Sequence, residues 1–304
     1  MKKIIFILLA LFSLSINAQE FEKNWNKVIT FEKEGKIKSA SEEVEKIYFQ
    51  AKKKVNEPQI IKTFFYRSKY ILDLEEDSKK RIISNLKDEI NVLSIPSKSI
   101  LMLVYAECLS GYYRKNKYKS QKRTDIKDDS ESDFTLWTNQ KFNIEIEKIY
   151  DESLKHEKAL KSIPLSKYKE ILDFEKAEDI QNKTLYDYVI QRNIIYYQLF
   201  LNGNFFNLSL EPISEKAYQL NEFKNTSFEN LENKTLLKLV KLYQKLEKEN
   251  PKNLKHAFER EKYLNAYIFR DKKRHLDFLN LLQKKTAELE FTQEILLVKA
   301  LAYN

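Results

Sequence analysis

Glycine, proline and cysteine are all scarce in this chain. Its 304 residues include three Gly, five Pro and one Cys, whereas an average protein uses roughly 7% Gly and 5% Pro. Sandwiches, barrels and propellers need a turn every few residues, so an all-β fold is excluded. Gly35, Gly111 and Gly203 stand far apart, which excludes the clustered glycines of dinucleotide-binding and P-loop folds. A lone cysteine, Cys108, cannot form a disulfide within the chain, so the fold is not a disulfide scaffold.

Charged side chains make up 33% of the chain and hydrophobic ones 42%. This is enough apolar material for a core, so a globally disordered chain is not expected. The formal net charge is +9, but basic and acidic residues alternate along most of the sequence. Such alternation is typical of a solvated surface, and we predict no nucleic-acid partner.

The N-terminus has the pattern of a secretory signal peptide. Two lysines precede an apolar run from Ile4 to Ile16, and Ala18 stands at the expected cleavage site. The alternative, a transmembrane anchor, needs about 20 apolar residues, and this run is shorter. We predict that residues 1–18 are removed and that the protein is exported to the periplasm, the cell surface or the extracellular space, with no membrane span after cleavage. Cleavage removes two basic residues and no acid, leaving 52 basic and 45 acidic residues and a net charge of +7.

Apolar residues recur at helical spacing through most of the remaining chain. Gly35, Gly203 and Pro251 stand where helices should end. Residues 116–134 and 204–230 are polar and lack the period, so we expect exposed loops that proteases cut readily. The pattern predicts helices at residues 21–34, 39–55, 59–74, 79–93, 97–114, 139–158, 184–201, 231–249, 254–269 and 271–289, with a last segment from 292.

Short connections between successive helices favour antiparallel pairs. The predicted fold is therefore all-α, an irregular, tetratricopeptide-like α-solenoid of stacked helix pairs. We expect a hairpin array over residues 19–115, a polar loop over 116–138, and a second array over 139–304 that continues the first. No 34-residue period is sustained, so regular repeats are not predicted. One stretch does match the turn and second helix of a tetratricopeptide hairpin: Gly35, Ile37, Ala40, Val44 and Ile47.

No motif for catalysis or metal binding stands out. His156, His256 and His275 have no second His or Cys at metal-ligand spacing, which favours surface histidines over ligands. The Gly-x-Ser-x-Gly elbow of serine hydrolases is absent. Cys108 lies in an apolar run, where a buried, inert thiol is favoured over a reactive one. We therefore predict no enzyme activity and no catalytic, cofactor-binding or metal-binding residue.

One run of the sequence is strongly basic. It holds six cations and no acid, with tyrosines interleaved, and such a run could bind an anionic polymer or a glycan. The alternative, which is favoured, is a solvated loop at a helix C-terminus, where cations interact well with the helix dipole. The candidate residues for an anionic partner are Arg114, Lys115, Lys117, Lys119, Lys122 and Arg123.

A series of short strings runs through nearly the whole mature chain. They are Trp25, Ser39-Ala40, Val44, Ile47-Tyr48, Ala51-Lys52, Gln59-x-Ile61-Lys62, Glu75-Glu76-Asp77, Pro96-x-Lys98-x-Ile100-Leu101, Ala106-Glu107, Tyr113-x-x-Asn116, Arg123-Thr124, Trp137, Tyr150-x-x-Ser153-Leu154, Thr184-Leu185-Tyr186-Asp187, Tyr243-Gln244-x-Leu246 and Ala300-Leu301-Ala302-Tyr303. In this order they resemble the N-terminal helical region of large exported alpha-2-macroglobulin family proteins of Bacteroidota.

The resemblance implies an exported protein related to broad-spectrum protease inhibitors. In that family the β-sandwich domains, the cleaved bait segment and the terminal domains follow the matched region, and some members carry a Cys-x-Glu-Gln thioester. Here the cysteine is followed by Leu109-Ser110-Gly111, so the thioester is absent. The chain resembles the leading helical portion of such a protein, truncated or split, and is not expected to trap a protease by itself.

Two functions are compatible with these observations. The first is a non-catalytic helical module of a macroglobulin-like protein, acting in scaffolding or partner contact. The resemblance implies protein partners for it, either downstream macroglobulin domains or proteases. The second is an independent tetratricopeptide-like periplasmic module that binds other proteins. No cofactor is predicted for either.

Overall fold

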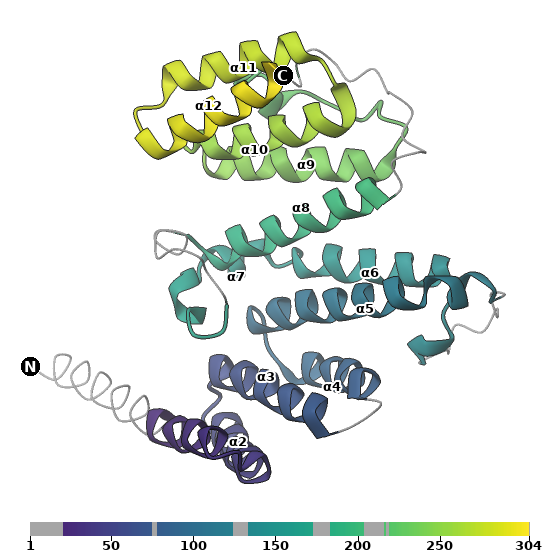
Figure 1. The fold of residues 1–304 in the computed structure, drawn as a ribbon, viewed down its shortest axis with the longest axis vertical. Coiled ribbons are helices and arrows are strands. Elements are labelled where there is room, and N and C mark those ends of the chain that lie inside the picture. The colour runs from purple at the N-terminus through teal and green to yellow at the C-terminus, as the bar shows by residue number, and fades with distance from the viewer. Residues whose placement is uncertain are drawn as a thin grey trace, which may run out of the picture. The chain divides into compact units, whose positions relative to one another are not determined.

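The computed structural model describes residues 21–74, 78–123, 133–172, 183–203, 216 and 219–303. The predicted signal peptide, residues 1–18, lies outside them. Helices make up the regular structure of this described part, and its only β interaction is an isolated bridge between Pro164 and Thr184. The helices pack in adjacent pairs along the chain, so the predicted all-α, solenoid-like fold is confirmed (Figure 1). No helix in the described ranges is long and apolar enough to span a bilayer.

The described residues form two compact units that divide between Val189 and Ile190. The division falls within one helix, Leu185–Gly203. The N-terminal unit contains helical residues 21–33, α2 (Ile37–Lys53), α3 (Glu57–Leu74), α4 (Ser78–Val92), α5 (Ser97–Gln121), η1 (Phe134–Leu136), α6 (Asn139–Ser153), α7 (Glu157–Lys161), η2 (Leu165–Tyr168) and the start of α8 (Leu185–Gly203). The C-terminal unit contains the rest of α8, η6 (Phe223–Asn225), α9 (Lys234–Glu249), α10 (Leu254–Leu264), the π-helical η7 (Asn265–Phe269), α11 (Lys272–Lys285) and α12 (Leu289–Tyr303).

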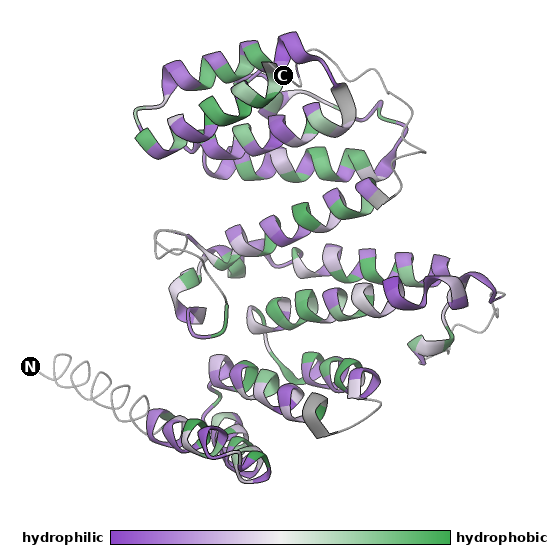
Figure 2. Cartoon of the chain, in the orientation of Figure 1, coloured by the Kyte–Doolittle hydropathy of each residue, from purple (hydrophilic) through white to green (hydrophobic). Residues whose placement is uncertain are grey.

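Each unit is held together by the apolar faces of its helices. Figure 2 shows apolar residues recurring among polar ones along the helices. In α2 the inward face is Ala40, Val44, Ile47 and Ala51, all fully buried. This spacing of three and four residues places them on one side of a helix. Burying such side chains supplies most of the stability of an isolated helix pair, since short helices are marginal in water.

Capping residues account for several helix ends. Asn233, Asn253 and Asp271 each accept a backbone N–H from the first turn of α9, α10 and α11. Gly35, with φ of +70°, ends the first helix as predicted. The Gly35 N–H donates to the carbonyl of Glu32 and the next N–H donates to that of Phe31, which is the Schellman arrangement.

Two sequence expectations differ from the structure. Helix α5 continues to Gln121, so residues 116–121 are helical and do not belong to a loop. The expected exposed stretch at 204–230 contains Phe223 and Phe228, which are both buried; residues 204–215 lie outside the described ranges.

Candidate functional site

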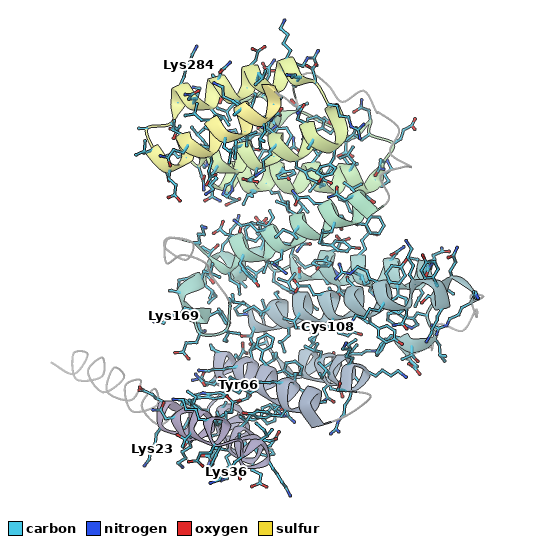
Figure 3. All side chains as sticks on the ribbon, in the orientation of Figure 1. Lys23, Lys36, Tyr66, Cys108, Lys169 and Lys284 are labelled. Carbon is cyan, nitrogen blue, oxygen red and sulfur yellow. The ribbon has the colours of Figure 1, made fainter. Side chains whose placement is uncertain are left out.

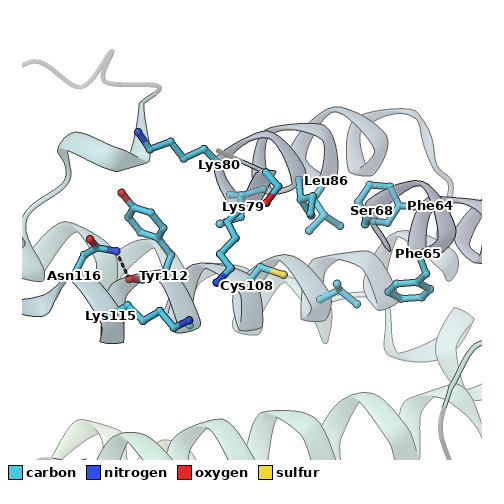
Figure 4. A pocket seen from close by; sticks show the side chains of 15 residues that line it. Phe64, Phe65, Ser68, Lys79, Lys80, Leu86, Cys108, Tyr112, Lys115 and Asn116 are labelled. Carbon is cyan, nitrogen blue, oxygen red and sulfur yellow. Dashed lines mark hydrogen bonds between the residues drawn. The ribbon is translucent and has the colours of Figure 1, made fainter. Parts of the chain in front are cut away.

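The N-terminal unit contains a cavity of about 630 Å³ between α3, α4 and α5. Its volume is in the range of ligand-binding pockets, roughly 300–1,000 Å³. Apolar and aromatic side chains form much of the wall, while several polar groups lie around it (Figure 4). The lining residues are Phe64, Phe65, Ser68, Ser78, Lys79, Lys80, Ile82, Ile83, Leu86, Val104, Cys108, Gly111, Tyr112, Lys115 and Asn116.

The two ends of this pocket differ in chemistry. Phe64 and Phe65 of α3 lie at one end, and Lys80, Tyr112 and Asn116 lie at the other (Figure 4). The Asn116 amide is fixed by donating to the Tyr112 carbonyl at 2.9 Å. A ligand with an apolar part and a polar or anionic part would therefore enter in one orientation.

Two lysines face each other at the polar side of the pocket. Lys79 reaches from α4 toward Lys115 on α5 (Figure 4). Contact with the Lys115 ammonium, and then its charge, lower the pKa of Lys79. Neither lysine has an ion-pair partner within the described ranges; the acidic residues 75–77 next to α4 lie outside them. An anion placed between these two ammonium groups would relieve their repulsion.

The predicted basic run is reorganised by the extension of α5. On a helix, Lys115, Lys119 and Lys122 share one side, because they follow spacings of four and three residues, whereas Arg114 lies nearer Lys117, which follows it by three residues. We call Lys115, Lys119 and Lys122 the basic face. Tyr118 lies among them and is 83% exposed. Lys117 points to another side of the helix by the same periodicity.

Arg123 belongs to the structure of the unit and not to the basic face. Its guanidinium Nη1 donates to the Trp137 carbonyl at 3.0 Å, which ties the end of α5 to the residue before the cap of α6. Of the six basic residues predicted for an anionic partner, the structure thus gathers three on one face. The loop interpretation of the sequence missed this arrangement, although Lys and Arg are good helix formers.

Cys108 lies midway along α5 and lines the pocket (Figure 3). The prediction of a buried thiol is therefore wrong in part: the side chain is half-buried. Burial, with a smaller effect of the Glu107 charge, raises the pKa of the Cys108 thiol from 9.0 to about 11. The thiolate is the reactive form, so this cysteine should be slow to react.

We expect iodoacetamide to alkylate Cys108 about 100-fold more slowly in the native protein at pH 8 than in the urea-denatured chain. The reason is the shift of about two pKa units, each of which lowers the thiolate fraction tenfold. The native rate should rise about tenfold per pH unit up to pH 10, since the thiolate fraction does. A native rate equal to the denatured rate at pH 8 would contradict the assignment.

A second surface lies on the C-terminal unit. The inner side of α12 carries Phe291 and Ile295, which are buried against α10 and α11. Its outer side carries exposed leucines, with 47% of Leu296, 63% of Leu297 and 67% of Leu301 accessible. Neighbouring exposed leucines on one helix form an apolar patch of the kind that marks protein contacts. We call these three residues the α12 leucine face.

The histidines lie in different surroundings. No group of three or more His, Cys, Asp or Glu side chains suited to a metal lies in the part of the chain that the structure describes. His156 is exposed, as expected for a surface histidine. His275 differs from that expectation, since it is buried on α11 with its Nδ1 3.4 Å from Glu261 Oε1. This contact is part of a buried charge cluster that also includes Arg260 and Glu247.

No protein-family model, curated protein or solved structure matches this chain.

Proposed function

We propose that this chain is a non-catalytic helical module that binds a protein partner through the α12 leucine face. The exposed leucines carry the proposal. Burying apolar surface releases roughly 25 cal/mol per Å², so three leucines that lie in water are a clear source of binding energy. The occupant we propose is an apolar helix face of another protein, since helix pairs in such arrays are covered by further helices.

The order of the short sequence strings supports a macroglobulin-like context for this module. In that context the chain is exported, and its partner is the macroglobulin-type portion of a split protein or a protease bound by it. The alternative is an independent tetratricopeptide-like module, which the Gly35 turn and the fully buried Ala40 of the first hairpin favour. The neighbouring reading frame separates the two, because only the first hypothesis expects it to encode macroglobulin domains.

The α12 leucine face can be tested with a photo-crosslinker at position 297 in cells of the source organism. The captured partner is then purified, and its affinity is measured for the wild type and for L297Q/L301Q. We expect binding to weaken at least tenfold, because two apolar contacts are replaced by polar ones. The control is L136Q, which changes a leucine that is 50% exposed on η1, and it should bind like the wild type.

Two results would overturn this proposal. Equal affinities of L297Q/L301Q and the wild type for the purified partner would remove the leucine face from the contact. A dimer of the wild type that L297Q/L301Q converts to monomers, with no heterologous partner crosslinked, would assign the face to a second copy of the chain.

We expect this chain alone to be a substrate of proteases and not an inhibitor. Trapping of the macroglobulin type needs a cleavable bait coupled to a large conformational change, and the resemblance places those parts after the matched region. In the test, trypsin is mixed with the chain at equal molarity. Its activity is then measured on a large protein substrate and on a small peptide. Loss of activity toward the large substrate alone is the signature of a cage and would refute the prediction.

A further inference from the structure

The pocket and the basic face are continuous on α5. Lys115 belongs to both: it lines the pocket and it starts the row of cations that ends at Lys122. Seven residues of helix separate these two lysines, which is about 10 Å at 1.5 Å per residue. A ligand seated in the pocket can therefore extend along α5 over a further series of positive charges.

The length of this row decides between two classes of ligand. A single-headed amphiphile such as a fatty acid would use the apolar end and the lysine pair, but would leave Lys119 and Lys122 without a role. A peptide in an extended conformation rises about 3.3 Å per residue, so 10 Å corresponds to about three residues. An apolar anchor followed by three or four carboxylates matches both the pocket and the row of cations.

We propose that α3, α4 and α5 bind an extended acidic segment of a protein partner, with its apolar anchor in the pocket and its carboxylates on Lys79, Lys115 and the basic face. The proposal rests on the function as a protein-binding module but uses a different surface from the α12 leucine face. Exposed Tyr118 lies beside the path of the segment and supplies a ring for packing. The chain's own acidic residues 125–131 have similar chemistry, so they are the competing occupant.

The test uses the mature protein and a fluorescein-labelled peptide of two leucines and one phenylalanine followed by four glutamates. Fluorescence anisotropy should show saturable binding, and the K79Q/K115Q variant should bind at least tenfold more weakly. The K117Q variant is the matched control, because Lys117 lies on the same helix outside the basic face; its affinity should change less than twofold. A peptide with glutamine in place of glutamate should lose most of its affinity.

Gly111 allows the pocket itself to be tested without damage to the fold. It lies within α5 and lines the pocket, and a Cβ atom added there would meet no atom within 4 Å. The G111L variant should therefore fill the pocket and weaken peptide binding at least tenfold. The G111A variant should bind normally, and both should melt no lower than the wild type, since leucine and alanine favour helix over glycine. Bound peptide should also protect Cys108 from alkylation.

Four outcomes would overturn the proposal. The first is equal binding by the wild type and by K79Q/K115Q or G111L. The second is that the peptide binds neither to the wild type nor to a D125N/D128N/D129N/E131Q variant, which lacks the competing charges. The third is binding by that neutralised variant alone, which would assign the pocket to the chain's own segment. The fourth is equally lysine-dependent binding to phosphatidylglycerol vesicles with none to the peptide. In each case the crosslinked partner of α12 would still bind, so the two proposals fail separately.

Discussion

Replacing Arg260 by methionine should lower the unfolding free energy of the C-terminal unit by about 3–5 kcal/mol, the usual cost of removing one partner from a buried ion pair. Arg260 is fully buried on α10. Its Nε donates to Glu247 Oε1 of α9 at 2.5 Å, and its Nη1 lies 3.9 Å from Glu261 Oε2. The substitution removes the arginine charge from two buried carboxylates, of which Glu261 still lies 3.4 Å from His275 Nδ1.

Packing adds to the electrostatic loss. The central carbon of the Arg260 guanidinium lies 3.8 Å from the centre of the Phe223 ring and 5.5 Å from that of Phe278. A planar cation stacked on an aromatic face gains a further attraction, which is strongest where water is excluded. Methionine fills part of this space but supplies neither the charge nor the planar donor group.

The unfolding free energy that R260M loses should grow as the pH rises. Burial raises the pKa of Glu247 above its ordinary 4.5, and the Arg260 charge opposes this shift. An acid with a raised pKa in the folded state stabilises the fold below the unfolded pKa and loses that contribution as the pH rises through the folded pKa. Without Arg260 the pKa of Glu247 rises further. The unfolding free energy lost in R260M should therefore be smaller near pH 4.5 than at pH 8.

This prediction is tested by urea unfolding, together with the hydrogen-exchange rates of α9, α10 and α11. The matched control is R274M, which removes an exposed pair between Arg274 Nε and Asp271 Oδ2 at 3.2 Å. An exposed pair contributes roughly 0–1 kcal/mol, so R274M should unfold nearly as the wild type does. The E247Q/R260M double variant should recover part of the loss. Equal stabilities of R260M and R274M would contradict the assignment.

The sequence predicted most helices of this chain because their signals are local. The apolar period, the capping Asn and Asp residues, and Gly35 each act within a few residues of the chain. Helix α5 was predicted too short because its last two turns are basic and polar. In the structure these turns satisfy their polar groups locally: Ser120 Oγ donates to the Asn116 carbonyl at 3.2 Å. Packing of Tyr112 and Tyr113 against α6 then holds the helix.

The pocket and the buried charges were beyond sequence reasoning for a different reason. The pocket brings together Phe64, Ile82 and Cys108, which lie on three separate helices. Arg260 and Glu247 look like surface residues of charged helices, and only the packing of α9 on α10 shows that both are buried. The basic run was visible in the sequence, but its division into a face and an anchored Arg123 required the helix geometry.

Replacing Phe142 by alanine should destabilise the contact between α5 and α6 by about 3–5 kcal/mol, as expected for removal of a buried ring and the cavity left behind. Phe142 is fully buried on α6. Its ring is stacked on Tyr113 with centroids 5.2 Å apart, and lies 5.3 Å from Trp137 and 6.1 Å from Tyr112. Tyr112 in turn meets Phe134 edge-on at 5.0 Å.

This cluster positions the wall of the pocket, since Tyr112 and Asn116 line it from the same part of α5. A single global unfolding free energy is poorly defined for a chain of two compact units, so hydrogen exchange gives the better measurement. We expect F142A to speed exchange in residues 112–121 and in α6, and F142L to do so less because it leaves a smaller cavity. Exchange in α10 and α11 is the internal reference and should change less. Two results would mean that Phe142 does not hold this part of α5 in place. One is hydrogen exchange that speeds up as much in α10 and α11 as in α5 and α6. The other is unchanged exchange in residues 112–121.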